Sequence, residues 1–243
     1  MTMPRKTLTI TDVTKMSGSS ICIAGYDASL TCIRPVLAKG QIKKSHLFQN
    51  NELITYPSAK VAFEFLNRNP HPPHIEDYIF REGSIQYEGE APVREWKEVL
   101  RETALASFEE LFPGMESRYV PPGEPGPSIG TMRAQTLPLL RCDYYGDKPS
   151  LRMQITDERG TIKQRIPITD LAFRGLFEHI LQRCQGNCEK AVKTLNRRLD
   201  GRNIFAIRVD ASFHEGSRSL QRLVLSSSKR NPHVSGSIRQ KLC

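Results

Sequence analysis

Two histidines and two carboxylates fall within seven positions of the stretch "NPHPPHIEDYIF", residues 69–80. His71, His74, Glu76 and Asp77 are residue types that bind metal ions or transfer protons. The two prolines between the histidines, however, exclude a helix and restrict how the two rings converge. The stretch therefore favours a structural or recognition loop without a metal. A metal-dependent hydrolase that uses His71, His74 and Glu76 stays open as an alternative.

A second group of possible ligands is Cys184 and Cys188, with His179 nearby. This spacing resembles half of a zinc knuckle, but no second cysteine pair follows at a suitable distance. The remaining carboxylates are scattered, and the chain has neither a phosphate-gripping glycine loop nor a nucleophile elbow. We therefore predict no cofactor and no catalytic activity.

Positive charge is concentrated in the second half of the chain. Residues 1–134 hold 15 Lys and Arg against 16 Asp and Glu, whereas residues 135–243 hold 20 against 10. Such an excess attracts polyanions, and nucleic acid is the commonest polyanion in a cytoplasm. A basic surface that only aids solubility is the alternative.

The segment "CEKAVKTLNRRLDGRN" places basic residues three to four positions apart, with Ala191, Leu195 and Leu199 between them. In a helix this spacing gives one apolar face and one cationic face, which favours phosphate contact over a merely solvated surface. In the first half, a loop around "RPVLAKGQIKKSH" offers further cations. The predicted contacts are Arg34, Lys43, Lys44, Lys190, Lys193, Arg197, Arg198, Arg202, Arg218, Arg222, Lys229 and Arg230.

These residues must be positioned by a fold rich in strands. In the first half, alternating or apolar runs at 6–16, 19–27, 29–37 and 60–68 predict a meander and a fourth strand. An apolar stripe over residues 92–112 predicts one helix that begins at Pro92 and ends before Pro113 and Gly114.

The second half repeats this pattern, with three short strands, two helices separated by residues 185–187 and a closing strand pair. Between the halves, residues 119–134 contain four prolines and three glycines, which predict a linker or a surface strap. We predict domains over 1–118 and 135–243 in a mostly β protein with some α, an α+β fold.

Six cysteines lack the spacings of a disulfide framework, so we expect reduced thiols. Cys22 and Cys32 lie in apolar runs and are expected in the core. The chain shows neither a signal peptide nor an apolar run long enough for a membrane span, so a cytoplasmic protein without a membrane partner is expected.

Three motifs in combination resemble the dual-OB-domain family of bacteria: "CIAGYDASLTCIRPV", "HPPHIEDYIF" and "YVPPGEPGPSIGTM". The resemblance implies two linked OB-like β-barrels, each with an accessory helix, and a nucleic-acid-related role in defence or mobile-element systems. The helical segment at 184–203 departs from the pattern as an apparent insertion.

The sequence thus predicts a non-catalytic protein that binds single-stranded DNA or RNA through backbone contacts and base stacking. A rival hypothesis is an adaptor that binds another protein, such as a helicase, nuclease or transposition protein. The metal-dependent hydrolase described above is the second rival.

Overall fold

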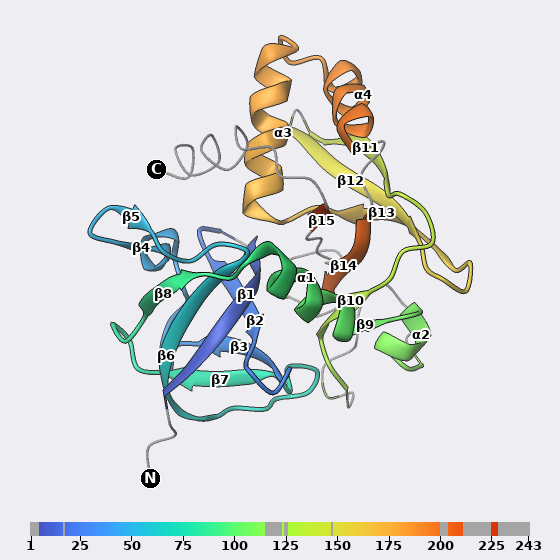
Figure 1. Ribbon diagram of the computed structural model, residues 1–243. Coiled ribbons are helices and arrows are strands. Elements are labelled where there is room, and N and C mark those ends of the chain that lie inside the picture. Colours follow the sequence, from blue (N-terminus) through green and yellow to red (C-terminus); the bar gives the residue numbers. More distant parts are fainter. Residues whose placement is uncertain are drawn as a thin grey trace.

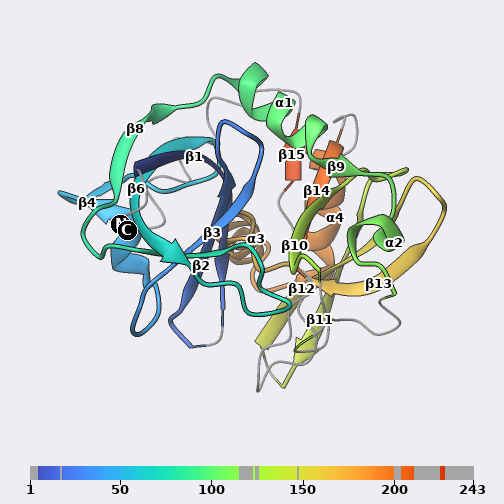
Figure 2. The same cartoon turned by 90° about the horizontal axis from the view of Figure 1, so that it is seen from below.

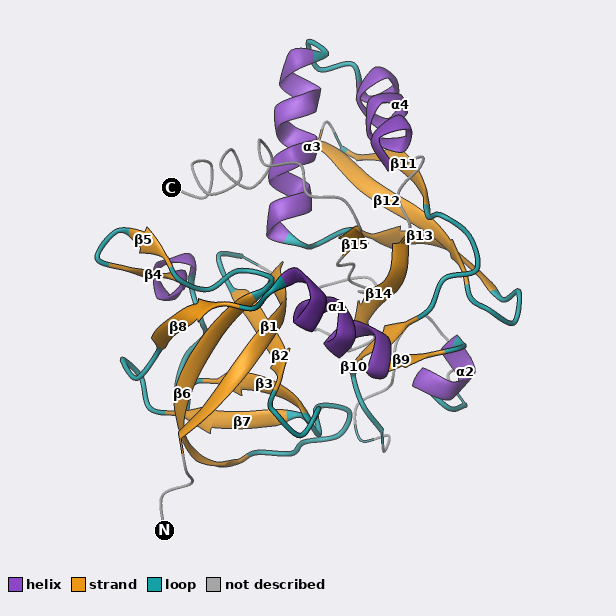
Figure 3. Cartoon of the chain, viewed as in Figure 1, coloured by secondary structure: helices purple, strands orange, loops and turns teal. Residues whose placement is uncertain are grey.

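The computed structural model describes residues 5–16, 18–114, 123, 126–146, 148–199, 204–210 and 225–227 (Figure 1). Strands predominate and a few helices accompany them, so the predicted α+β class is confirmed (Figure 3). Within the described residues, no helix is both long and apolar enough to cross a bilayer.

A five-stranded barrel forms the first half. Its strands are β1 (Arg5–Lys15), β2 (Ile21–Tyr26), β3 (Cys32–Val36), β6 (Ala59–Arg68) and β7 (Asp77–Phe80). They pair in the order β1, β2, β3, β7, β6, and β6 pairs back to β1, which closes the barrel. β3 and β7 are parallel, whereas the other neighbours are antiparallel. This is a five-stranded Greek-key barrel of the OB type.

Strand β1 pairs with two neighbouring strands because it bends. Its first residues pair with β6 and its later ones with β2, and the register shifts between Ile10 and Asp12. A bulge of this kind turns a strand from one sheet direction to another. Leu8, Phe63 and Phe65 then point into the barrel, where they are almost fully buried. The predicted strands of this half are therefore confirmed.

The other elements of this half lie outside the barrel, and the last two of them pack on the second half of the chain. They are η1 (Lys44–Leu47), β4 (Phe48–Gln49), β5 (Glu52–Leu53), β8 (Gln86–Glu90), α1 (Val93–Glu102), β9 (Ala104–Leu105) and α2 (Phe108–Leu111).

The prediction of one helix over 92–112 is wrong, because the chain leaves the helix after α1. Thr103 Oγ1 donates to the carbonyl of Val99 at 2.8 Å, and β9 then pairs with a strand of the second half. Ser107 starts α2 by accepting a hydrogen bond from the amide of Glu110 at 3.2 Å. Capping and strand pairing here prevail over the helical periodicity.

The second half repeats the order of the first. Its elements are β10 (Ile129–Met132), β11 (Leu139–Tyr145), β12 (Lys148–Thr156), β13 (Ile162–Pro167), α3 (Leu171–Arg183), α4 (Cys188–Leu199), β14 (Ile204–Asp210) and β15 (Leu225–Ser227). β11, β12 and β13 form one sheet, a meander, while β10 pairs with β14 and β14 with β15 in another. Together these two sheets are called the second barrel, although among the described residues no strand pair closes them into a ring. β10 and β11 together therefore correspond to the bent strand β1. The helices α3 and α4 were correctly predicted.

The same aspartate turn joins the second and third strands of each half. Asp27 Oδ1 accepts the amides of Ser29 at 3.0 Å and Thr31 at 3.1 Å. Asp157 Oδ1 accepts the amides two and four positions after it, at 3.0 and 2.8 Å. Both aspartates are buried. The turn marks β12 and β13 as the counterparts of β2 and β3.

The predicted linker over 119–134 includes strand β10. All four residues of this strand are buried, and they pair with β14 on one side and β9 on the other. The description of the whole segment as a linker or surface strap is therefore wrong for its last part. Its prolines all precede β10, so the strand itself has an amide at every position.

Cys142 and Cys188 form a disulfide that joins β11 to α4, with their Cα atoms 6.1 Å apart. The expectation of reduced thiols is wrong for this pair, because residues 46 positions apart in the sequence meet at the edge of the second barrel. Cys22 is buried in β2, as predicted.

Replacing Gly25 with alanine is expected to lower the free energy of unfolding by about 1–3 kcal/mol. A Cβ atom there would lie 2.6 Å from the carbonyl oxygen of Thr9, so the backbone of β1 would have to move. Gly175, in α3, is the control because a Cβ atom there meets nothing within 4 Å. Urea unfolding should show Gly175→Ala unchanged or more stable; equal losses for both variants would contradict the prediction.

Candidate nucleic-acid interface

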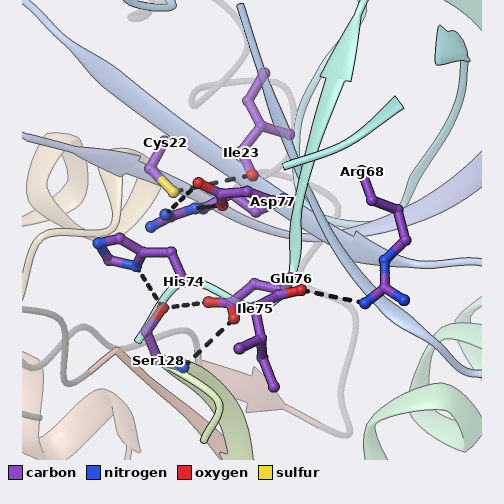
Figure 4. A network of polar contacts seen from close by, with 9 residues as sticks. Cys22, Ile23, Arg68, His74, Ile75, Glu76, Asp77 and Ser128 are labelled. Carbon is purple, nitrogen blue, oxygen red and sulfur yellow. Dashed lines mark hydrogen bonds and ion pairs between the residues drawn. The ribbon is translucent and has the colours of Figure 1, made fainter. Parts of the chain in front are cut away.

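The stretch with the two histidines forms the connection from β6 to β7 and ends in a buried ion pair (Figure 4). Asp77 accepts two hydrogen bonds from the Arg34 guanidinium, one of them from Nη2 to Oδ2 at 2.9 Å. Arg34 is 6% exposed and Asp77 is 7% exposed. Burial disfavours the charge of Arg34, but the bonds to Asp77 and the neighbouring carboxylates hold its pKa above the ordinary value. The pair fastens β3 to β7.

The prediction that Arg34 contacts nucleic acid is therefore wrong. Its guanidinium is buried on the outer side of the barrel, on the face opposite to Ile33, and is bound to Asp77, so no phosphate reaches it. The prediction rested on the count of cations in its segment, which does not distinguish a solvent-exposed arginine from a buried one.

His74 and Glu76 both bind Ser128, which lies directly before β10 (Figure 4). His74 Nδ1 lies 2.9 Å from Ser128 Oγ, and the hydroxyl in turn donates to the carboxylate of Glu76. Ser128 and Glu76 are buried, whereas His74 is half-buried. Since residues 128 and 129 begin the second barrel, the stretch ties the two barrels together.

This arrangement supports the structural reading of the stretch. The hydroxyl stands between the histidine and the glutamate, whereas a catalytic triad places the histidine between the nucleophile and the carboxylate. The side chain of His71 is exposed. Among the described contacts, His71 makes hydrogen bonds only through its backbone, to the backbone of His74. Within the described part of the chain, no three His, Cys, Asp or Glu side chains are grouped to hold a metal ion.

The outward face of β2 in the first barrel is covered by β10 (Figure 2). Cys22 and Ala24 pack against Ile129, and the hydroxyl of Tyr26 lies 3.3 Å from Thr131 Oγ1. This contact is the main apolar junction between the barrels. It leaves no room for a ligand on that face.

No described residue covers the corresponding face of the second barrel. Along β12, Leu151, Met153 and Ile155 are buried, so the alternate side chains point outward. The outward residues of the meander include cations and aliphatics: Arg141, Arg152, Arg165, Leu139 and Ile162. Tyr144, near the end of β11 on the side of Leu140 and Cys142, is 61% exposed, the highest value among the large apolar side chains described.

Arg165 shows how this face is organised. It lies in β13 with a φ of 56°, and its guanidinium reaches across β12 to Asp143 on β11, at 3.0 and 3.1 Å. Arg165 is exposed, so its hydrogens that Asp143 does not use face solvent. The open face of the meander therefore carries cationic groups held at fixed places.

Helix α4 lies along the free edge of β11. Asn196 accepts from the amide of Leu140 at 3.1 Å and donates to its carbonyl at 3.3 Å. On a helix of 3.6 residues per turn, Asn196 separates the buried side of α4 from the side with Lys193 and Arg197. These two cations consequently lie on the side of α4 that adjoins the outer face of β11.

The prediction for α4 agrees with this geometry. Ala191, Leu195 and Leu199 are buried, while the four basic residues are exposed: Lys190, Lys193, Arg197 and Arg198. Lys43 and Lys44 are also exposed, but they belong to η1 and its cap on the first barrel. Figures 1 and 2 place β4, which follows η1 directly, on the side away from α4. Arg202, Arg218, Arg222, Lys229 and Arg230 lie outside the described residues.

The chain matches the family model described as the dual OB-containing domain over residues 6–194. It belongs to this family. The match includes the first barrel, the meander of the second barrel and most of α4, so the dual OB-containing domain extends through the candidate interface. The predicted resemblance is confirmed. No match was found among curated proteins.

Membership of the dual OB-containing domain family connects the geometry to a class of ligands. OB folds bind oligonucleotides or oligosaccharides on the face of their second and third strands. In this member, that face is β2–β3 in the first barrel and β12–β13 in the second. Because β10 covers β2, the second barrel alone offers the OB-type face among the described residues. The sequence indicates which strands of the two halves correspond. Both "YDASLT" and "TDERGT" place an aspartate four positions before a threonine, at the junction of the second and third strands.

Proposed function

We propose that this protein binds single-stranded DNA or RNA on the outer face of β11–β13 and on the adjoining cationic face of α4. The observation that carries the proposal is the contrast between the two barrels. Equivalent faces are covered in the first barrel and left uncovered by the described residues in the second, where the face carries cations and the exposed ring of Tyr144 lies at the end of β11, on the other side of that strand. Cations that meet phosphates and rings that stack on bases are the two components of single-strand binding.

The position of the charges supports nucleic acid over an oligosaccharide. Lys190, Lys193 and Arg197 recur at intervals of three and four residues on α4, and Arg141 and Arg165 lie on the neighbouring strands. Rows of cations match a repeating phosphate backbone, whereas neutral sugars need no such row. The proposal assigns no catalytic step, because His74 and Glu76 are engaged with Ser128.

Charge reversal on α4 is expected to weaken binding and reduce its salt dependence. For Lys193→Glu with Arg197→Glu, two lost phosphate contacts should lower the slope of log K against log salt by about 1.4. Fluorescence anisotropy with labelled single-stranded DNA, single-stranded RNA and duplex DNA, each in a salt series, measures this slope.

The matched control is Lys43→Glu with Lys44→Glu, which makes the same charge change on the first barrel. It should leave the slope close to that of the natural protein. Equal losses in both double variants would show attraction by net charge rather than a site on the second barrel. Absence of binding to every ligand at low salt would overturn the proposal.

A second candidate is an adaptor, favoured by exposed aliphatic side chains on the same face. Leu139 is 44% exposed and Ile162 is 53% exposed, and neither offers a flat ring for a base. A protein partner such as a helicase, nuclease or transposition protein, in a defence or mobile-element system, would cover them. Copurification that persists at high salt and is lost in Leu139→Glu would favour this role.

A further inference from the structure

The disulfide between Cys142 and Cys188 lies at the junction of the two elements that form the proposed interface. Cys142 lies in β11 between Arg141 and Asp143, both on the outer side of that strand. Cys188 is the first residue of α4, two positions before Lys190. The sulfur bridge therefore joins the cations of the strand to those of the helix.

Two attachments fasten α4 to β11, one toward each end of the helix. The disulfide holds the N-terminal residue, and the two hydrogen bonds of Asn196 hold the last turn but one. Lys190 and Lys193 lie between these points in the sequence. Without the disulfide, the contacts described between the N-terminal turn of α4 and the core of this half are the apolar ones of Cys188 and Ala191.

The two cysteines of the bridge differ in exposure. Cys142 is half-buried, whereas Cys188 is only 6% exposed. An attacking thiolate would therefore reach the sulfur of Cys142, and the sulfur of Cys188 would leave. The leaving sulfur lies at a helix N-terminus, where the backbone amides stabilise negative charge. Disulfides in reducing compartments are mostly transient or redox-sensing, and the cytoplasm is the compartment that we expect.

We propose that Cys142–Cys188 is a thiol–disulfide exchange site that controls how firmly the cationic face of α4 is held at the interface. A thiol of the glutathione class attacks Cys142 as its thiolate, the bridge breaks and the Cys188 thiolate takes up a proton. A second thiol of the same class then releases Cys142 as a thiol. Together the two small thiols are oxidised to one disulfide, and the bridge gains two electrons and two protons.

The effect on binding rests on the proposed function, and its direction follows from the position of the bridge. The oxidised chain holds Lys190 and Lys193 ready beside β11, whereas the reduced chain must order them on binding. We expect reduction with glutathione to weaken the affinity for single-stranded nucleic acid at least about fivefold.

Three measurements on the full chain test the site. In denaturant, N-ethylmaleimide should label four of the six cysteines before reduction and all six after it. Hydrogen exchange of the α4 amides should become faster on reduction. Anisotropy should show the loss of affinity. The variant Cys188→Ser should resemble the reduced protein in both redox states, whereas the neighbouring control Cys184→Ser, outside the disulfide, should respond as the natural chain does.

Each contrary outcome has a distinct meaning. Labelling of all six cysteines under mildly oxidising conditions would overturn the exchange site. A bridge that forms but changes neither hydrogen exchange nor affinity would overturn its control of α4. If neither redox state binds nucleic acid, the proposed function fails, and labelling together with hydrogen exchange still decides whether the bridge holds the helix.

Discussion

Replacing Arg34 with leucine is expected to lower the free energy of unfolding by about 3–5 kcal/mol, because it leaves the carboxylate of Asp77 buried without its cation. Asp77 accepts both hydrogen bonds from this arginine at a buried position, and the carboxylate of Glu76 lies in the same connection. Urea unfolding followed by circular dichroism measures the change.

The control for this effect is an arginine of the same barrel that lies at its surface. Arg81 pairs with Glu64 at 3.3 Å, and both side chains are at least half exposed. Arg81→Leu should cost no more than about 1 kcal/mol. If Arg34→Leu does not fold, the double variant Arg34→Leu with Asp77→Leu should recover stability, since it removes both charges. A similar small cost for both single variants would contradict the buried pair.

The second large effect is a loss of stability as pH rises, caused by Asp170 at the start of α3. This carboxyl is buried, and its Oδ2 has no partner among the described residues, while Oδ1 accepts the amide of Phe173 at 2.7 Å. Burial is the main cause that raises the pKa of Asp170 to about 7, and the carboxylate of Asp12 on β1 raises it further. The backbone amides of Phe173 and Ala172 act in the opposite direction.

The direction of this pH effect follows from the protons that the folded and the unfolded chain bind. Between pH 3.8 and about 7, the unfolded chain has released the proton of Asp170 while the folded chain retains it. Rising pH therefore favours unfolding in this window, by up to about 4 kcal/mol. The stability that Asp170 contributes is complete below the window and lost above it.

The variant Asp170→Asn should remove this pH dependence, because an amide keeps the bond to Phe173 and carries no charge. The difference in unfolding free energy between the variant and the natural chain is then larger at pH 8 than at pH 5. Glu98→Gln, at an exposed position of α1, is the control and should show equal differences at both values. If the difference between Asp170→Asn and the natural chain were the same at pH 5 and pH 8, the raised pKa of Asp170 would be contradicted.

Local patterns predicted the elements that depend on local physics. The alternation around Leu8 and Ile10 and the stripe of Ala191, Leu195 and Leu199 each identified a buried face correctly. The cationic side of α4 followed from the same stripe. These residues obey strand and helix periods, which can be recognised without knowledge of their partners.

Contacts between distant segments could not be predicted in this way. Arg34 and Asp77 are 43 positions apart, and Ser128 is 52 positions from Glu76, so neither pairing leaves a periodic signal. The helix ends after α1 because β9 pairs with β10, and the disulfide forms because α4 packs beside β11. The covered face of β2 also escaped prediction, because Cys22 and Ala24 look the same whether they face a core or another barrel.

The hydrogen bonds of Asn196 to Leu140 have a consequence for solubility. Leu140 belongs to a strand whose far edge would otherwise present an unsatisfied amide and carbonyl to other chains. Unprotected strand edges recruit further strands and lead to aggregation. The amide side chain satisfies both groups at once, so α4 also keeps the second barrel from adding a strand of another molecule at this position.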